Sequence, residues 1–103
     1  MIDLDLKTIA NAVQAPLSEA FDQQQVKGCV IDSRQVVSGN LFVAIKGENF
    51  DGHDFVEQAR AAGAVAAVVS QAVSSDLPQL VVKDTEKALG QLAAAWRDRF
   101  ATK

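Results

Sequence analysis

Two polar segments of this sequence contain the residue types that bind small polar ligands. The tripeptide Asp32-Ser33-Arg34 follows one apolar run, and residues 46–54 follow another. A planar polar ring attached to an anion would suit these segments. They supply hydroxyl and carboxylate groups, the backbone amides of Gly47 and Gly52, the ring of Phe50 and two cations. The chemistry indicated by these segments is therefore ligand binding, at loops that follow strands.

The same residues also allow a purely structural interpretation. Arg34 would then pair with Asp32 or Asp51, Phe50 would anchor its loop, and the glycines would only satisfy turn geometry. Composition and spacing alone favour this second interpretation.

The sequence lacks the residues that other common catalytic or metal-binding sites require. The chain has one His, one Cys and no Tyr, so a catalytic triad, a His-rich metal site or thiol chemistry is not expected. Gly47 and Gly52 have the spacing of a phosphate loop, but His53-Asp54 stands where that loop requires Lys and Ser or Thr. We therefore expect His53 to bond a nearby backbone group or carboxylate, and Cys29 to be a buried, reduced thiol.

Length and composition define the class of protein. With 103 residues, of which 49% are hydrophobic and 22% charged, the chain corresponds to one globular domain with a single core. The formal net charge of -3 argues against a nucleic-acid partner. The acidic N-terminus is unlike a signal peptide, and no apolar stretch approaches the ~20 residues of a membrane span. We therefore expect a cytoplasmic protein with no membrane partner.

Apolar runs and helix signals alternate along the chain and predict an α/β fold. A strand, helix and strand in succession form a crossover unit, whose strands are parallel. The expected architecture is a layered sheet of about four to five strands, partly parallel and flanked by helices. The predicted elements are a helix at 5–14, a loop at 18–25, strands at 26–31 and 41–45, a helix from 54 to 63, strands at 64–69 and 80–82, and a helix from 84 onward.

The middle helix has start and stop signals of its own. Asp54 and Glu57 have the three-residue offset of a capping box, in which each side chain satisfies a free amide at the helix start. Gly63 suits a left-handed C-terminal cap. The helix is therefore predicted to begin at Asp54 and to end at Gly63.

Three segments together resemble the N-terminal domain of the Mur ligases. They are Asp32-Ser33-Arg34, the run G-N-L-F-V-A-I-K-G at 39–47 and the run F-D-G-H-D-F at 50–55. The first is weak on its own, whereas the three at this spacing are specific, and the resemblance covers nearly the whole chain. It implies that residues 1–103 form a single N-terminal domain that binds the uridine end of a UDP-sugar-peptide. The ATP-binding central domain and the C-terminal domain would be absent from this chain.

The resemblance also implies a set of substrate-binding residues around the uridine. The Ser33 hydroxyl and backbone groups near Ile31 and Asn49 are expected to meet the uracil edge, with Phe50 in apolar contact. The two cations of the set would either help to hold the diphosphate or serve as structural ion-pair partners, and both alternatives stay open. The full set is Ile31, Ser33, Arg34, Lys46, Gly47, Glu48, Asn49, Phe50 and Asp51.

Within this family, the sequence is most similar to the ligase that adds D-alanyl-D-alanine to UDP-N-acetylmuramoyl-tripeptide in peptidoglycan synthesis. Two alternatives stay open: the sister ligase that adds the third peptide residue, and a stand-alone non-catalytic interaction module of the same fold. The resemblance implies ATP and Mg²⁺ for the full-length enzyme, with no cofactor, metal or catalytic residue in this domain and no activity of this segment alone. The expected partners are UDP-N-acetylmuramoyl-tripeptide and, through the missing domains, D-alanyl-D-alanine, and the protein is expected to be a monomer.

Overall fold

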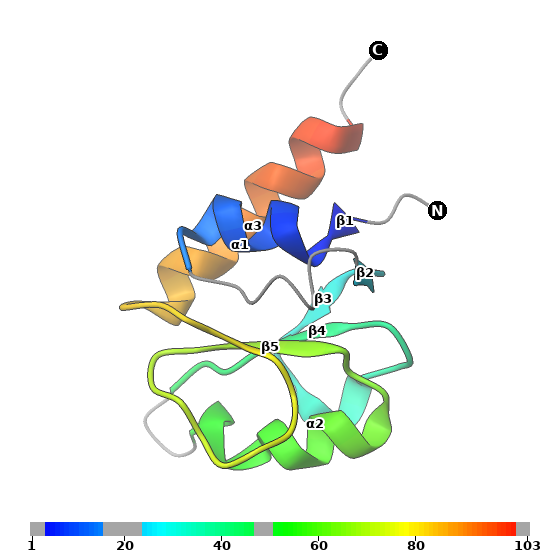
Figure 1. The fold of residues 1–103 in the computed structure, drawn as a ribbon, viewed down its shortest axis with the longest axis vertical. Coiled ribbons are helices and arrows are strands. Elements are labelled where there is room, and N and C mark those ends of the chain that lie inside the picture. Colours follow the sequence, from blue (N-terminus) through cyan, green and yellow to red (C-terminus); the bar gives the residue numbers. More distant parts are fainter. Residues whose placement is uncertain (1–3, 16–23, 47–50, 101–103) are drawn as a thin grey trace.

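The computed structural model describes residues 4–15, 24–46 and 51–100. Its centre is a four-stranded parallel sheet with the strand order β3-β4-β5-β6. Helices α1 and α3 cover one face of this sheet, and α2 covers the other (Figure 1). This arrangement confirms the predicted α/β sheet flanked by helices. The strands are β3 (Cys29–Val30), β4 (Leu41–Val43), β5 (Ala66–Val69) and β6 (Gln79–Val81), and the helices are α1 (Leu6–Val13), α2 (Val56–Ala62) and α3 (Thr85–Phe100).

The central strands β4 and β5 are covered on both faces, as their uninterrupted apolar sequence predicts. Every residue of both strands is buried. Successive side chains on a strand point to opposite faces, so Leu41 and Val43 pack with α1 and α3, while Phe42 packs with α2. The residues of β5 alternate in the same way. The sheet therefore separates two apolar clusters.

The first predicted strand is wrong in its extent. The sequence predicts one strand over 26–31, whereas the structure has β2 (Gln25–Val26), which pairs antiparallel with β1 (Leu4–Asp5), and β3 after it. Between them, Gly28 adopts a left-handed conformation with φ of 101°. The chain bends at this glycine, so one apolar run is divided between two sheets.

Two helix starts agree with their sequence signals. The Asp5 side chain accepts a hydrogen bond from the Thr8 backbone N–H at 2.8 Å and caps α1. At α3, the Asp84 side chain accepts from the backbone N–H groups of Glu86 and Lys87, at 2.9 and 3.2 Å. Both helices therefore begin where the acidic residues predict. Most of the predicted loop at 18–25 lies outside the described residues, and its last residue belongs to β2.

The predicted capping box is wrong. A 3₁₀ turn, η3 (Gly52–Phe55), precedes α2, so Asp54 lies inside this turn and not at a helix start. The cap of η3 is Asp51, whose side chain accepts from the His53 backbone N–H at 3.0 Å. The Glu57 side chain accepts instead from Arg60, at 3.0 and 3.1 Å. The predicted end of α2 is confirmed, because the residue after it, Gly63, has φ of 118°.

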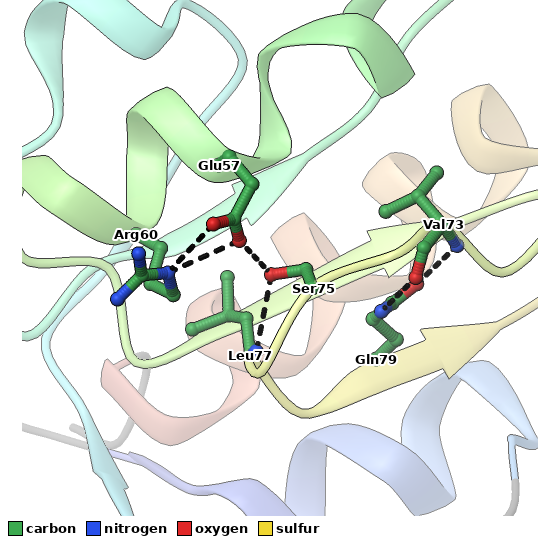
Figure 2. A network of polar contacts seen from close by, with 6 residues as sticks. All are labelled: Glu57, Arg60, Val73, Ser75, Leu77 and Gln79. Atoms are coloured by element: carbon green, nitrogen blue, oxygen red, sulfur yellow. Dashed lines mark hydrogen bonds and ion pairs between the residues drawn. The ribbon is translucent and has the colours of Figure 1, made fainter.

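Side-chain hydrogen bonds hold the segment between β5 and β6 (Figure 2). The Ser75 hydroxyl donates to the Glu57 carboxylate on α2 and accepts from the Leu77 backbone N–H at 3.1 Å. The side-chain amide of Gln79 bonds both backbone groups of Val73, accepting and donating at 2.8 Å. These contacts fix the segment against α2 and at the start of β6.

None of the helices within residues 4–15, 24–46 and 51–100 has the length and apolar character needed to cross a membrane.

Candidate binding site at the carboxyl edge of the sheet

A pocket of about 510 Å³ opens where the turn after β3 meets the turn before α2. The first turn follows β3 directly, so the pocket lies at the carboxyl ends of the parallel strands, where open α/β sheets bind ligands. The two polar segments singled out in the sequence thus contribute to one pocket. Its lining residues are Ile31, Asp32, Ser33, Arg34, Phe42, Gly52, Phe55 and Gln58.

The first wall of the pocket is the turn η2 (Ser33–Gln35). The Asp32 side chain accepts from the Arg34 backbone N–H at 2.9 Å and closes the turn. The Arg34 guanidinium also bonds both Asp32 oxygens, Nε to Oδ1 at 3.1 Å and Nη2 to Oδ2 at 2.9 Å. Side-chain hydrogen bonds from Arg34, followed by its backbone N–H, lower the pKa of the Asp32 carboxyl. The structural pairing of Arg34 with Asp32 is therefore confirmed, at the pocket rim.

Ser33 presents an unused polar group to this pocket. The residue is only 7% exposed and lines the pocket wall. No residue in the described part of the chain hydrogen-bonds its hydroxyl. A buried hydroxyl without a partner costs roughly 1–3 kcal/mol, so such a group favours a ligand that can complete its bonding.

Aromatic and aliphatic side chains supply the apolar part of the pocket. Phe42 comes from β4 on the α2 side of the sheet, and Phe55 ends η3. Ile31 lies on the opposite turn and is half exposed, which places an apolar group at the mouth. Flat rings bury well against such surfaces. The pocket therefore combines apolar walls with a few polar groups, as small-molecule sites do.

Gly52 allows the second turn to approach the chain that continues β4. Its backbone N–H donates to the Ile45 carbonyl at 2.9 Å. A Cβ at this position would lie 2.7 Å from the Ile45 nitrogen, closer than real Cβ contacts. A glycine is therefore needed for the turn to pack here while still lining the pocket.

The second predicted segment is described only at its ends. Lys46 and Asp51 form an antiparallel bridge, but neither is among the described residues that line the pocket. Hydrogen bonds from the backbone N–H and the ring of His53, with the charge of Lys46 a smaller cause, lower the pKa of the Asp51 carboxyl. Four other predicted residues of this segment lie outside the described part of the chain: Gly47, Glu48, Asn49 and Phe50.

Sequence reasoning left out several residues of the pocket. Phe42 was interpreted only as part of a buried strand, because the sequence does not say which face of the sheet carries the pocket. Phe55 and Gln58 have the i, i+3 spacing of neighbours on one helical face, and this spacing was the available signal. The omitted lining residues are Phe42, Phe55 and Gln58, whereas Asp32 and Gly52 belong to the two polar segments but not to the expected uridine set.

The structure also shows how the lone histidine is used. His53 is 8% exposed, its Nδ1 lies 2.6 Å from Asp51 Oδ1, and its Nε2 accepts from the Ser70 backbone N–H at 2.9 Å. The predicted structural role, with a carboxylate and a backbone group as partners, is confirmed. Within the described residues, no group of three or more His, Cys, Asp or Glu side chains could hold a metal ion. Cys29 is half-buried, and this burial raises the pKa of its thiol.

The fold and the pocket together define an α/β domain with a pocket at the carboxyl edge of its parallel sheet. Residues 25–97 match the family model described as "Mur ligase family, catalytic domain". This match covers well over half of the chain, and curated relatives at 45–49% identity support it. The chain belongs to the Mur ligase family.

Individual relatives show which ligases the chain is similar to. It is 45% identical over 94 residues to the UDP-N-acetylmuramoyl-tripeptide–D-alanyl-D-alanine ligase of Escherichia coli K12, covering 91% of this chain and 20% of that protein. It is 49% identical over 74 residues to the UDP-N-acetylmuramoyl-L-alanyl-D-glutamate–2,6-diaminopimelate ligase of Aquifex aeolicus, covering 72% of this chain and 15% of that protein. Two different ligases thus match at similar identity.

A solved structure agrees with these relatives. The crystal structure of MurF from Acinetobacter baumannii superposes with a TM-score of 0.85 at 37% identity, covering 96% of this chain and 22% of that chain. The present chain therefore spans about a fifth of the length of the curated relatives it matches.

Proposed function

We propose that this chain holds the uridine end of a UDP-sugar-peptide as the N-terminal domain of a peptidoglycan ligase. The observation that carries this proposal is the Ser33 hydroxyl, which is buried in the pocket wall without a partner among the described residues. Uracil is flat and has a hydrogen-bonding edge of one donor and two acceptors. It therefore needs both apolar walls and a polar group such as this hydroxyl.

Each part of the pocket has a role in this proposal. The uracil ring packs between the apolar walls of Phe42 and Phe55, and its edge meets the Ser33 hydroxyl. The Arg34 side chain is 81% exposed, so its guanidinium can turn from Asp32 toward a diphosphate at the rim. The segment of residues 46–51 completes the site with backbone groups, Phe50 and the charge of Lys46.

The substrate that fits the relatives best is UDP-N-acetylmuramoyl-tripeptide, to which the whole protein would add D-alanyl-D-alanine. Relatives named for this activity, from E. coli and Haemophilus influenzae, match 91% and 97% of the chain at 45% and 46% identity. The second candidate is the ligase that adds 2,6-diaminopimelate, which the 49% identity to the A. aeolicus relative favours. Both candidates would work in the cytoplasm, where their nucleotide-linked substrates are available.

ATP and Mg²⁺ belong, in this proposal, to parts of the ligase outside this chain. The chain contains no G-x-x-x-x-G-K-[ST] segment to hold triphosphate. Its described residues also lack a cluster of acidic or His side chains that fits a metal ion. The role left to this domain is to bind and orient the nucleotide end of the substrate.

Calorimetric titration of UDP into the chain tests the proposed site. We expect saturable binding of UDP, and Ser33→Ala is expected to weaken it roughly 5- to 10-fold, because one hydrogen bond to the uracil edge is lost. Ser38→Ala is the matched control, since this exposed serine precedes β4 at the opposite edge of the sheet. Equal affinities of Ser33→Ala and the parent chain would reject the assigned contact, and absence of UDP binding would reject the uridine site.

A second assay separates the two ligases. The gene product that carries this chain is supplied with ATP and with either UDP-N-acetylmuramoyl-tripeptide plus D-alanyl-D-alanine or UDP-N-acetylmuramoyl-L-alanyl-D-glutamate plus 2,6-diaminopimelate. We expect phosphate release to depend on the first pair. Release with the second pair alone would identify the diaminopimelate-adding ligase instead.

A further inference from the structure

The pocket at the carboxyl edge of the sheet has a second polar side chain to which the proposed function gives no role. Gln58 lies on α2, three residues after Phe55, and both residues line the pocket. No residue in the described part of the chain hydrogen-bonds the Gln58 side-chain amide. An amide group has two N–H donors and a carbonyl acceptor. Gln58 therefore brings unused bonding capacity of both kinds to the pocket.

The charged neighbours of Gln58 on α2 are engaged away from the pocket. Arg60 donates to the Glu57 carboxylate, which also accepts from the Ser75 hydroxyl (Figure 2). Both side chains are thus held near the segment between β5 and β6, and neither is among the described residues that line the pocket. Gln58 is therefore the polar side chain that α2 contributes to this pocket.

The turn η2 packs against α2 and supplies the other uncharged polar group. Asp32 and Arg34 line the pocket, but their side chains are bonded to each other. Ser33, between them, is buried in the wall with an unused hydroxyl. The described lining thus has two uncharged polar side chains with unused bonding capacity, Ser33 and Gln58, one on each of two packed elements.

A uracil base has an edge that matches these two groups. Its N3–H donor lies between two carbonyl acceptors, at C2 and C4. A glutamine amide can bond such an edge twice, because its oxygen accepts while its nitrogen donates to the adjacent acceptor. The remaining carbonyl is then left for a hydroxyl donor such as that of Ser33. All three polar groups of the base would be bonded without any charged partner.

We propose that Gln58 binds the base, accepting from the uracil N3–H through Oε1 and donating to an adjacent carbonyl through Nε2. This inference rests on the function proposed above and extends the site from η2 to α2. The ring of Phe55, one helical turn before Gln58, provides the apolar surface beside the base.

Calorimetric titration with UDP and with N3-methyl-UDP tests this contact. Methylation removes the N3–H donor, and Gln58→Leu removes the amide while keeping a side chain of similar size on α2. We expect each change alone to weaken binding about tenfold. The two changes together should weaken it little further, because both remove the same contact. Gln91→Leu on α3, which covers the other face of the sheet, is the matched control and should bind both ligands like the parent chain.

NMR of the side-chain amide gives a second readout. The NH₂ signals of Gln58 are identified by their absence from the spectrum of the Gln58→Leu chain. We expect them to shift when uridine is added and to stay in place when inorganic pyrophosphate is added. A shift with pyrophosphate but not with uridine would place the anion at Gln58, which would overturn the assigned contact.

The outcomes separate this inference from the proposed function. If Gln58→Leu binds UDP like the parent chain, or if methylation weakens binding by the same factor in both chains, Gln58 does not contact the base. UDP binding by the parent chain would then still support the uridine site. Circular dichroism of Gln58→Leu checks that weaker binding does not come from unfolding. If the parent chain binds neither UDP nor uridine, the proposed function fails and this inference fails with it.

Discussion

Gly52 is the residue at which a single methyl group should have the largest effect on the pocket. A Cβ there would lie 2.7 Å from the Ile45 nitrogen and 3.0 Å from Ala44 Cα, and backbone atoms cannot move aside as a flexible side chain can. We expect Gly52→Ala to lower the free energy of unfolding by roughly 1–3 kcal/mol, a typical cost of overpacking. Urea unfolding followed by circular dichroism measures this change.

Gly90 provides the matched control for this substitution. It lies exposed within α3, and a Cβ there would meet nothing within 4 Å. Gly90→Ala is expected to raise the free energy of unfolding by about 0.5–1 kcal/mol, because alanine loses less conformational freedom in a helix. A destabilised Gly90→Ala, or an unchanged Gly52→Ala, would contradict the packing described around Gly52.

At the scale of elements, Glu57 links α2 to the segment that leads into β6. Hydrogen bonds from Arg60, and then from Ser75, lower the pKa of its carboxyl in the folded protein (Figure 2). Since the folded-state pKa lies below the unfolded one, the stabilisation is present above the unfolded pKa and is lost as pH falls through the folded pKa. The link should therefore weaken in acid.

The stability of a Glu57→Gln variant should therefore differ from that of the parent chain in a pH-dependent way. The variant should be less stable than the parent chain at neutral pH and should approach the parent in acid, where the carboxylate of the parent becomes protonated. Urea midpoints measured across the acid range check this, with Glu86→Gln on the first turn of α3 as the control for loss of a charge. A constant difference between Glu57→Gln and the parent at all pH values would show that the carboxylate charge does not stabilise the link.

Sequence reasoning predicted the elements where the signal extends over several consecutive residues. The buried strands β4 and β5 follow from apolar runs, and α1 from the periodic spacing behind Asp5. It failed for β1 and β2, because two-residue strands have no period to detect. It also failed at the start of α2. Asp54 has a correct capping offset, but its own N–H donates to the Asp51 carbonyl at 3.0 Å inside η3.

At the scale of the whole molecule, the sheet separates the pocket from the larger apolar cluster. Val43 and Phe42 are neighbours on β4, but Val43 packs with α1 and α3, whereas Phe42 packs with α2 and lines the pocket. Val43→Ala is expected to cost about 1–3 kcal/mol of stability through the cavity it leaves, with UDP affinity unchanged. Phe42→Leu is expected to weaken UDP binding with a smaller loss of stability.

Thermal unfolding and calorimetric UDP titration of both variants check this separation. Loss of affinity in a folded Val43→Ala chain would show that the two faces are coupled. A Phe42→Leu chain that binds UDP like the parent would remove this ring from the site.

The position of the site could be predicted from the sequence better than its composition. A parallel sheet brings the turns after its strands to one edge, so Asp32-Ser33-Arg34 and the segment after β4 were expected to meet there. The side chains that line the pocket depend on which face the turns fold over. The sequence contains Phe42 and Gln58, but only the packing of α2 shows that they contribute to the pocket.

The two aspartates that open η2 and η3 have a consequence for electrostatics at this edge. Each turns its carboxylate back onto the amide two residues ahead, at 2.9 Å for Asp32 and 3.0 Å for Asp51, and Asp32 is further compensated by an arginine. The negative charges of these two carboxylates are therefore partly offset by groups of their own loops, so they repel an approaching polyanion less than the formal charge of -3 suggests. The net negative charge of the domain does not determine the local electrostatic field at this edge of the sheet, where a polyanionic ligand would bind.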